Sequence, residues 1–161
     1  MTEINRTGVK TIPKVSDRII DGLFAGIIAG VVMAGYLLVV GMIIGDSPTE
    51  ILLRFALNEG DPALIGGLFH LAVSAVYGAL FGLGFYALSR FWRRELPLWM
   101  ASLLGAAYGF LLYTLALTII LPGTNSALSQ VPQLHFAIAH VIFGICLSTI
   151  LGRNGSKHGA G

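Results

Sequence analysis

Four long apolar stretches, separated by short polar segments, dominate the sequence. In a window of about 19 residues they lie at roughly 19–45, 64–88, 96–121 and 134–152. Each is about 19 to 27 residues long, so as a helix rising about 1.5 Å per residue it covers roughly 28 to 40 Å, enough to cross a hydrocarbon core with some tilt. The pattern predicts an all-α integral membrane four-helix bundle, with residues 1–18 and 153–161 as tails. The first stretch is longer than the apolar run of a signal peptide, so we expect it to be retained.

The composition agrees with a membrane location. Of the 161 residues, 55% are apolar and 11% are charged, and the mean hydropathy is +0.81. Soluble domains carry about 25% charged residues, and disordered chains contain few apolar ones. Both of these classes are therefore excluded.

Basic residues fall almost entirely on one side of the predicted spans. Only Arg54 lies in a loop on the other side, and the remaining nine lie in the tails and between the second and third stretches. Lysine and arginine collect in cytoplasmic segments, so both termini are predicted to face the cytoplasm, in a cell (inner) membrane. The basic rim favours contact with anionic membrane lipids and, as a general feature of topology, predicts no nucleic-acid partner.

A motif recurs in the second and fourth stretches, 70 residues apart. The pattern HxxxSxxxGxxxG begins at His70, and HxxxGxxxSxxxG begins at His140. With shorter glycine ladders on the first and third stretches, the small residues at this spacing are Gly22, Gly26, Gly30, Ser74, Gly78, Gly82, Gly105, Gly109, Gly144 and Ser148. Small residues let helices approach closely in lipid. We therefore predict a tandem repeat of two transmembrane hairpins in which these residues pack helices, within the chain or between copies.

A short helix is predicted in the first outer loop, over 47–58. Ser47 and Glu50 have the spacing of a capping box, and Pro48 takes the favoured first helical position. The apolar residues that follow share one face. We expect the helix to rest on the outer membrane interface or to cover the mouth of the bundle.

No Asp, Glu, Lys or Arg lies well inside any predicted span. Ion-coupled carriers, pumps and intramembrane hydrolases need such groups, so the sequence predicts neither a catalytic site nor an enzyme. At depth, only His70, His140, Cys146 and several tyrosines can titrate or bind a ligand. Cys146 in an apolar helix is expected to behave as a small hydrophobic residue.

The histidine pair has three interpretations. In the first, each imidazole donates to a backbone carbonyl or to Tyr36, Tyr108 or Tyr113, and so holds helices together. In the second, His70 and His140 are the axial ligands of one haem b. In the third, they belong to a polar path or metal site of a small transporter, although two histidines are too few for a tight metal site. No role is expected for His135, or for His158 in a tail that looks disordered.

The segments that follow His70 and His140, the latter reading HVIFGICLS, give the chain a resemblance to small prokaryotic four-span membrane proteins of unknown function. In these proteins a histidine and a glycine ladder recur on the second and fourth helices. Phe143 and Ser148 stand here where that pattern has tyrosine and glycine. In size and helix count the chain is also similar to the YagU-like inner-membrane group. The resemblance implies a fold and a location, and no mechanism.

The leading hypothesis is therefore a non-enzymatic membrane protein without a cofactor. It would act through its surfaces, as a homo-oligomer or as an accessory subunit of a larger membrane complex. A bis-histidine haem electron carrier and a small-solute or metal transporter are the alternatives.

Overall fold

The chain folds into long helices. The computed structural model describes residues 14–58, 60–92, 97–123 and 127–157, and all the regular structure within them is helical. The α-helices are α1 (Val15–Ile44), α2 (Pro48–Leu53), α3 (Ala63–Trp92), α4 (Leu98–Leu115) and α5 (Gln133–Lys157), with a π-helical turn η1 (Ala116–Ile120) and 3₁₀ turns η2 (Leu121–Gly123) and η3 (Ala127–Gln130). Four segments are long and apolar enough to cross a membrane, namely Val15–Ile44, Ala63–Leu88, Leu98–Ile120 and Gln133–Arg153. The predicted all-α class is confirmed, as is the presence of four helices long and apolar enough to span a membrane.

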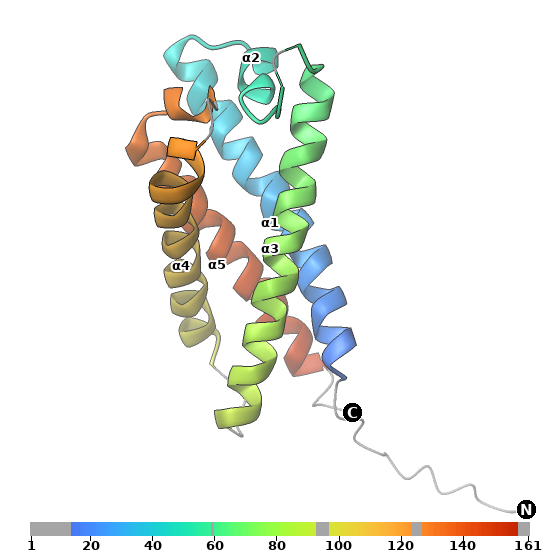
Figure 1. Ribbon diagram of the computed structural model, residues 1–161. Coiled ribbons are helices and arrows are strands. Elements are labelled where there is room, and N and C mark those ends of the chain that lie inside the picture. The colour runs from blue at the N-terminus through green and yellow to red at the C-terminus, as the bar shows by residue number, and fades with distance from the viewer. Residues whose placement is uncertain (1–13, 59, 93–96, 124–126, 158–161) are drawn as a thin grey trace, which may run out of the picture.

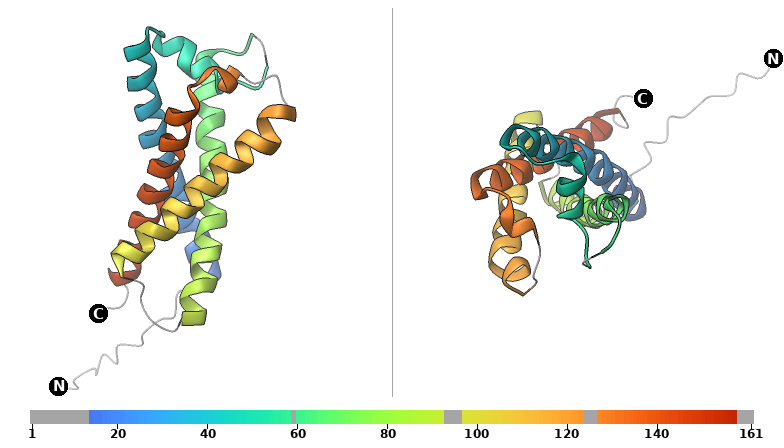
Figure 2. Two further views of the ribbon diagram at one scale, coloured as in Figure 1. Left: turned by 90° about the vertical axis from the view of Figure 1, so that its left-hand side faces the viewer. Right: turned by 90° about the horizontal axis from the view of Figure 1, so that it is seen from above.

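Two hairpins pack side by side through their central helices (Figure 1). The main contacts are between α1 and α3, between α4 and α5, and between α1 and α5. Helices α1 and α5 therefore form the centre, and α4 crosses the bundle obliquely (Figure 2, left). The start of α1 and the end of α5 lie at the same end of the bundle, whereas α2 and the η turns lie at the other, here called the α2 end.

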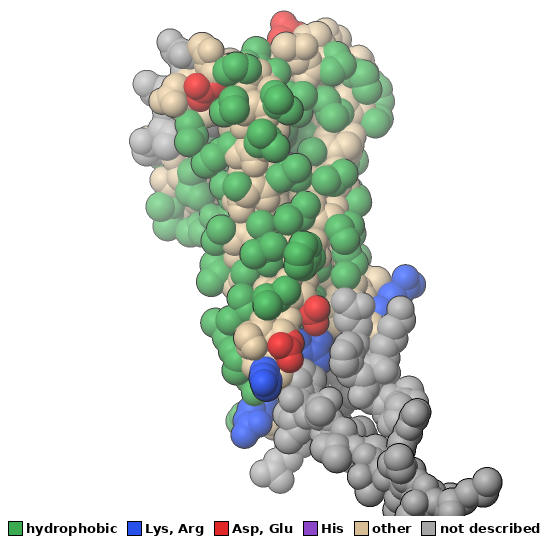
Figure 3. All heavy atoms as spheres, turned by 90° about the vertical axis from the view of Figure 1, so that its right-hand side faces the viewer, with side chains coloured by type: hydrophobic (Ala, Val, Ile, Leu, Met, Phe, Trp, Pro, Cys, Tyr) green, Lys and Arg blue, Asp and Glu red, His purple; other side chains and the backbone are tan. Residues whose placement is uncertain are grey.

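Apolar side chains cover the middle of the molecule. In Figure 3 they fill the face between the two ends, and charged side chains gather near the ends. Large apolar side chains are exposed on every spanning helix, among them Phe24, Val76, Leu103 and Leu134. A surface of this kind is stable in hydrocarbon, where helices already pair their own backbone groups.

Helix ends depart from the predicted span limits where polar residues continue the helical hydrogen bonding. Helix α1 begins at Val15 and ends at Ile44. Gly45, whose φ of 102° is left-handed, caps it, and the Asp46 amide donates to the Gly41 carbonyl at 2.9 Å. Helix α5 continues to Lys157, so the expectation of a disordered tail is wrong up to that residue. Residues 158–161 lie outside the described part. The apolar pattern marks the part of a helix suited to lipid, not the helix end.

The third span is α-helical only to Leu115. In the π turn that follows, the Leu121 amide donates to the Ala116 carbonyl, five residues back. Pro122 comes next and has no amide hydrogen for the usual bond to a carbonyl four residues earlier. The helix therefore widens and ends in 3₁₀ turns.

Helix α2 forms where the capping box predicts it but is shorter than the predicted segment. The Glu50 amide donates to Ser47 Oγ at 3.2 Å, and the Ser47 amide donates to the Glu50 carboxylate at 2.7 Å. The helix ends at Leu53 because the next turn tightens to bonds spanning three residues. Ile51 is only 2% exposed and lies against Gly41 of α1. The apolar face of α2 is therefore turned onto the bundle.

The cap of α2 is predicted to weaken in acid. Hydrogen bonds from the Ser47 backbone and side chain lower the pKa of the Glu50 carboxyl. Their stabilisation is complete above the ordinary glutamate pKa of about 4.3 and is lost as the pH falls through the lowered value. Hydrogen-exchange protection of the α2 amides, corrected for intrinsic rates, should fall in that range. Glu50→Gln should remove this dependence, and a pH response that survives the substitution would contradict the assignment.

Candidate functional site

The small residues of α1 and α3 bring these two helices into backbone contact. A Cβ built on Gly26 would lie 2.8 Å from Gly78 Cα, and one built on Gly22 would fall on the Gly78 carbonyl oxygen. Real Cβ atoms do not approach a backbone so closely, so only glycine fits at these positions. The next step of the ladder pairs Gly30 with the Ser74 side chain.

The second hairpin has an equivalent contact between α4 and α5. Gly105 faces Gly144 and the Ser148 side chain, and Gly109 faces the backbone of His140. The Ser148 hydroxyl donates to the Ile145 carbonyl at 3.0 Å and is fully buried. All ten small residues singled out in the sequence therefore lie in the two hairpin contacts. They are occupied within the chain and are not an open surface for a second copy.

Gly78→Ala should destabilise the protein, because the new Cβ would fall on the backbone of α1. Overpacking of this kind costs about 1 to 3 kcal/mol of the free energy of unfolding. Thermal or denaturant unfolding in detergent micelles measures the loss. Gly84→Ala, on the same helix with nothing within 4 Å of the added atom, is the matched control and should leave stability unchanged or raise it. Equal losses in both variants would contradict the contact.

His70 joins three elements near the α2 end. Its Nε2 donates to the Gly30 carbonyl of α1 at 3.1 Å. The ring packs against Phe55, which follows α2, with centroids 4.4 Å apart. Phe55 is itself only 6% exposed. The imidazole thus ties α3 to α1 beneath the segment that follows α2.

His140 is held in a similar way in the other hairpin. Its Nδ1 donates to the Phe136 carbonyl, one turn earlier on α5, at 2.8 Å. The ring packs on the Phe136 ring with centroids 4.5 Å apart and meets Tyr113 of α4 edge-on at 6.2 Å. Each histidine therefore donates one ring N–H to a backbone carbonyl and packs against one phenylalanine.

Tyr36 and Tyr108 join helices through hydrogen bonds to partners other than His70 and His140. The Tyr108 hydroxyl donates to the Tyr77 carbonyl at 2.8 Å and so joins α4 to α3. The Tyr36 hydroxyl is hydrogen-bonded to His135 Nδ1 at 2.9 Å and joins α1 to α5. His135, for which no functional role is expected, thus takes part in a helix contact. No sequence signal identifies the pair, because its members are 99 residues apart.

The geometry of the histidine pair does not fit axial ligation of a haem. A histidine that coordinates through Nε2 needs that nitrogen free, whereas Nε2 of His70 is hydrogen-bonded to Gly30. Phenylalanine rings also pack directly on both imidazoles. Among the residues with a described placement, no three His, Cys, Asp or Glu side chains come together as a possible metal site.

Protein purified from cells supplied with haem precursor should show no stoichiometric b-type absorption band, oxidised or dithionite-reduced. The reason is the engaged Nε2 of His70, which would have to leave Gly30 before it could bind iron. A Soret band that disappears in both His70→Ala and His140→Ala would overturn this expectation.

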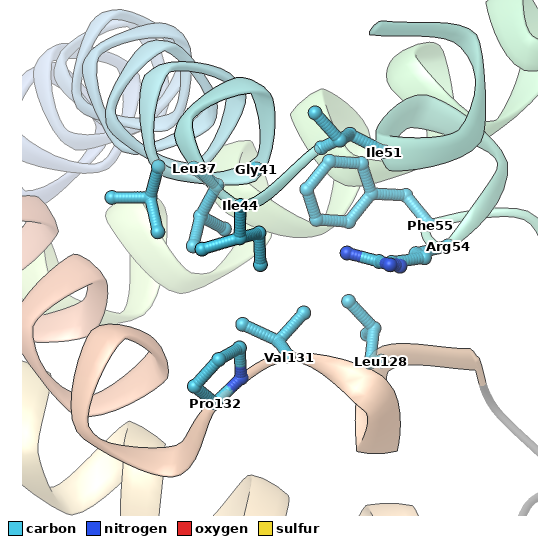
Figure 4. A pocket seen from close by; sticks show the side chains of 10 residues that line it. Leu37, Gly41, Ile44, Ile51, Arg54, Phe55, Leu128, Val131 and Pro132 are labelled. Atoms are coloured by element: carbon cyan, nitrogen blue, oxygen red, sulfur yellow. The ribbon is translucent and has the colours of Figure 1, made fainter. Parts of the chain in front are cut away.

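An ion pair between Arg54 and Asp46 lies at the α2 end, with nitrogen and oxygen 2.7 Å apart. The two side chains are 13% and 22% exposed, so the pair is largely removed from water. Arg54 also borders an apolar hollow between α1, α2 and the start of α5, shown in Figure 4. Neither the burial of this arginine nor the hollow is evident from the sequence pattern.

Comparison with known proteins adds no further constraint. A scan against family models, a search of curated proteins and a search of solved structures each found no match. Function is therefore argued from the residues of this chain.

Proposed function

We propose that the protein is a non-enzymatic, multi-pass protein of the cell (inner) membrane that acts through its helix surfaces, as a homo-oligomer or as an accessory subunit of a membrane complex. One observation carries the proposal. The polar side chains at depth hold helices together, as His70 does with Gly30, Tyr108 with Tyr77, and Tyr36 with His135. Polar side chains that are already used in hydrogen bonds between helices support a structural role, as a scaffold, for this protein.

The tandem-hairpin organisation is part of the proposal. Each hairpin has a glycine contact, a serine that faces a glycine of the partner helix, and a histidine one turn before the first small residue of the ladder on its second helix. At the 70-residue offset Ser74 corresponds to Gly144 and Gly78 to Ser148, so the serine of the second hairpin stands one turn further along its helix than the serine of the first. This shared pattern supports the proposal of two related hairpins that meet along α1 and α5.

The proposed topology places both termini in the cytoplasm. Of the ten basic residues in the sequence, only Arg54 belongs to the α2 end. Among the described residues, Lys14, Arg18, Arg90 and Arg153 lie towards the opposite end, where α1 begins and α3 and α5 end. Positive charge on that side favours its retention in the cytoplasm. The α2 end then faces outward.

The proposed contact with another protein must use a helix face other than the glycine ladders, because the chain's own helices already pack against those ladders. The lipid-facing sides of the four spans are the faces that remain. Their exposed apolar positions include Phe24 and Ile28 of α1, Leu68, Val76 and Leu80 of α3, Leu103, Phe110 and Leu111 of α4, and Ile138 and Ile145 of α5.

A tryptophan scan of these exposed positions tests the proposal. The mass of the particle in mild detergent, and the proteins recovered with it after crosslinking in membranes, should correspond to a homo-oligomer or a defined complex. Substitutions on one face should reduce that assembly severalfold while the unfolding temperature stays unchanged, because exposed positions tolerate size changes. A wild-type protein that is monomeric and recovers no companion in membranes of native composition would refute the proposal.

A further inference from the structure

His70 and His140 each keep one ring nitrogen that the hydrogen bonds to Gly30 and Phe136 do not use. A carbonyl oxygen can only accept, so Nε2 of His70 and Nδ1 of His140 carry the ring hydrogens. In a neutral imidazole the other nitrogen has a lone pair. This nitrogen is Nδ1 in His70 and Nε2 in His140. In the part of the chain that the structure describes, no donor is bonded to either of them.

A free nitrogen across the ring from a bonded N–H is the arrangement found in metal-binding histidines. Such histidines almost always donate their second ring N–H to a carbonyl, a carboxylate or water, which fixes the tautomer and orients the lone pair. His70 does so with the Gly30 carbonyl, and His140 does so with the Phe136 carbonyl. The same two hydrogen bonds therefore prepare both imidazoles to bind a metal ion.

The two histidines lie at nearly the same depth, as their contacts with α1 and the direction of the helices show. His70 is bonded to Gly30 of α1, and Tyr36 of α1 is bonded to His135 of α5. Gly30 comes six residues before Tyr36, and His140 comes five residues after His135 on a helix that runs the opposite way (Figure 1). At about 1.5 Å per residue these steps are roughly 9 and 7.5 Å. Gly30, and with it His70, is therefore nearly level with His140.

The two imidazoles are also near each other. They are close enough for a charge on His70 to act on His140. The helices that carry them, α3 and α5, both pack against α1. The Phe55 ring packs on His70 with centroids 4.4 Å apart, and the Phe136 ring packs on His140 at 4.5 Å. Rings packed this closely favour a small ion over an organic cofactor between the two histidines.

The surroundings of the pair select a soft, monovalent cation. No Asp, Glu, Lys or Arg of the sequence lies well inside a predicted span, so no carboxylate at this depth balances a metal charge. The cost of burying an ion rises with the square of its charge, which opposes a divalent ion most strongly. Zn²⁺ also prefers a tetrahedral ligand set. Cu(I) carries a single charge, binds imidazole and accepts a low coordination number.

A thioether is present at the same level. Met33 lies one turn beyond Gly30 on α1, is only 6% exposed and belongs to the same apolar core as Phe55. A helix carbonyl points towards the following turn, so the Gly30 oxygen that accepts from His70 is directed to the turn that contains Met33. Thioether sulfur is a soft ligand and selects Cu(I).

We propose that Nδ1 of His70 and Nε2 of His140 bind one Cu(I) ion between the two hairpins, with the sulfur of Met33 as a third and weaker ligand. The ion joins α3 and α5 across α1, at the level where Gly30 already holds His70. This inference goes beyond the proposed scaffold, because it requires neither a second copy nor a partner protein.

Transfer of Cu(I) to the full chain in mild detergent tests the site. The ion is kept reduced with ascorbate and is supplied as the complex of a coloured chelator, so that its transfer gives both stoichiometry and affinity. One ion per chain should bind, an equal concentration of Zn²⁺ should not displace it, and the bound ion should raise the unfolding temperature. Absence of transfer, or a preference for Zn²⁺, would overturn the proposal.

Two substitutions remove the free nitrogens and keep the structural hydrogen bonds. The amide nitrogen of glutamine can take the place of Nε2, and that of asparagine can take the place of Nδ1. His70→Gln can therefore still donate to Gly30, and His140→Asn can still donate to Phe136. Each should lower the Cu(I) affinity more than about 100-fold, since loss of an orienting hydrogen bond alone costs about 10- to 100-fold. Wild-type affinity in either variant would contradict the site.

Three further variants serve as controls and as a second test. His135→Asn should keep the wild-type Cu(I) affinity, because His135 is outside the proposed ligand set and bonded to Tyr36. Met33→Leu should lower the affinity severalfold and, since it nearly conserves volume, should fold even if a histidine variant does not. Met42→Leu, 49% exposed on the same helix, should change nothing. Equal losses in His135→Asn and the two histidine variants would refute the assignment.

The copper measurements are independent of those that test the proposed function. A chain that is monomeric, recovers no companion and still binds Cu(I) through the two histidines would retain the metal site and lose the scaffold proposal. A stable assembly that takes up no Cu(I) would retain the scaffold proposal and lose the metal site.

Discussion

Backbone contact between helices at glycine is the constraint on which the rest of this structure depends. Lipid tails are as apolar as the side chains they touch, so helices in a membrane are held together by close packing and by interhelical hydrogen bonds. In this chain, Gly26 meets Gly78 in one hairpin and Gly105 meets Gly144 in the other, at distances that leave no room for a Cβ. These two contacts fix which faces of the four long helices turn inward.

The polar contacts at depth follow from that close approach. With α1 and α3 touching, the Gly30 carbonyl comes within reach of His70, and Ser74 fits beside the same glycine. An imidazole in an apolar bundle is stable only when its N–H has an acceptor. The bond of His70 thus depends on the glycine contact of its hairpin, whereas His140 donates to the Phe136 carbonyl of its own helix.

The α2 end is organised differently, through a cap and a largely buried ion pair. The left-handed Gly45 ends α1, and the capping box at once starts α2. Ile51 and Phe55 then anchor the segment on the bundle. Arg54 is held between apolar walls and is paired with Asp46, an arrangement that gives this end of the molecule a chemistry distinct from that of the middle.

The sequence by itself determined the features that depend on local pattern. Run lengths of apolar residues gave the four spans, and the spacing of Ser47, Pro48 and Glu50 gave the start of α2, because capping and membrane crossing are set by neighbouring residues. Tertiary structure decided the rest. The ladders of small residues form the contacts within each hairpin. Tyr36 bonds His135, 99 residues away in the sequence, and Arg54 is buried beside a hollow. No local pattern encodes these features, because each depends on how distant helices rotate and cross when their backbones come into contact.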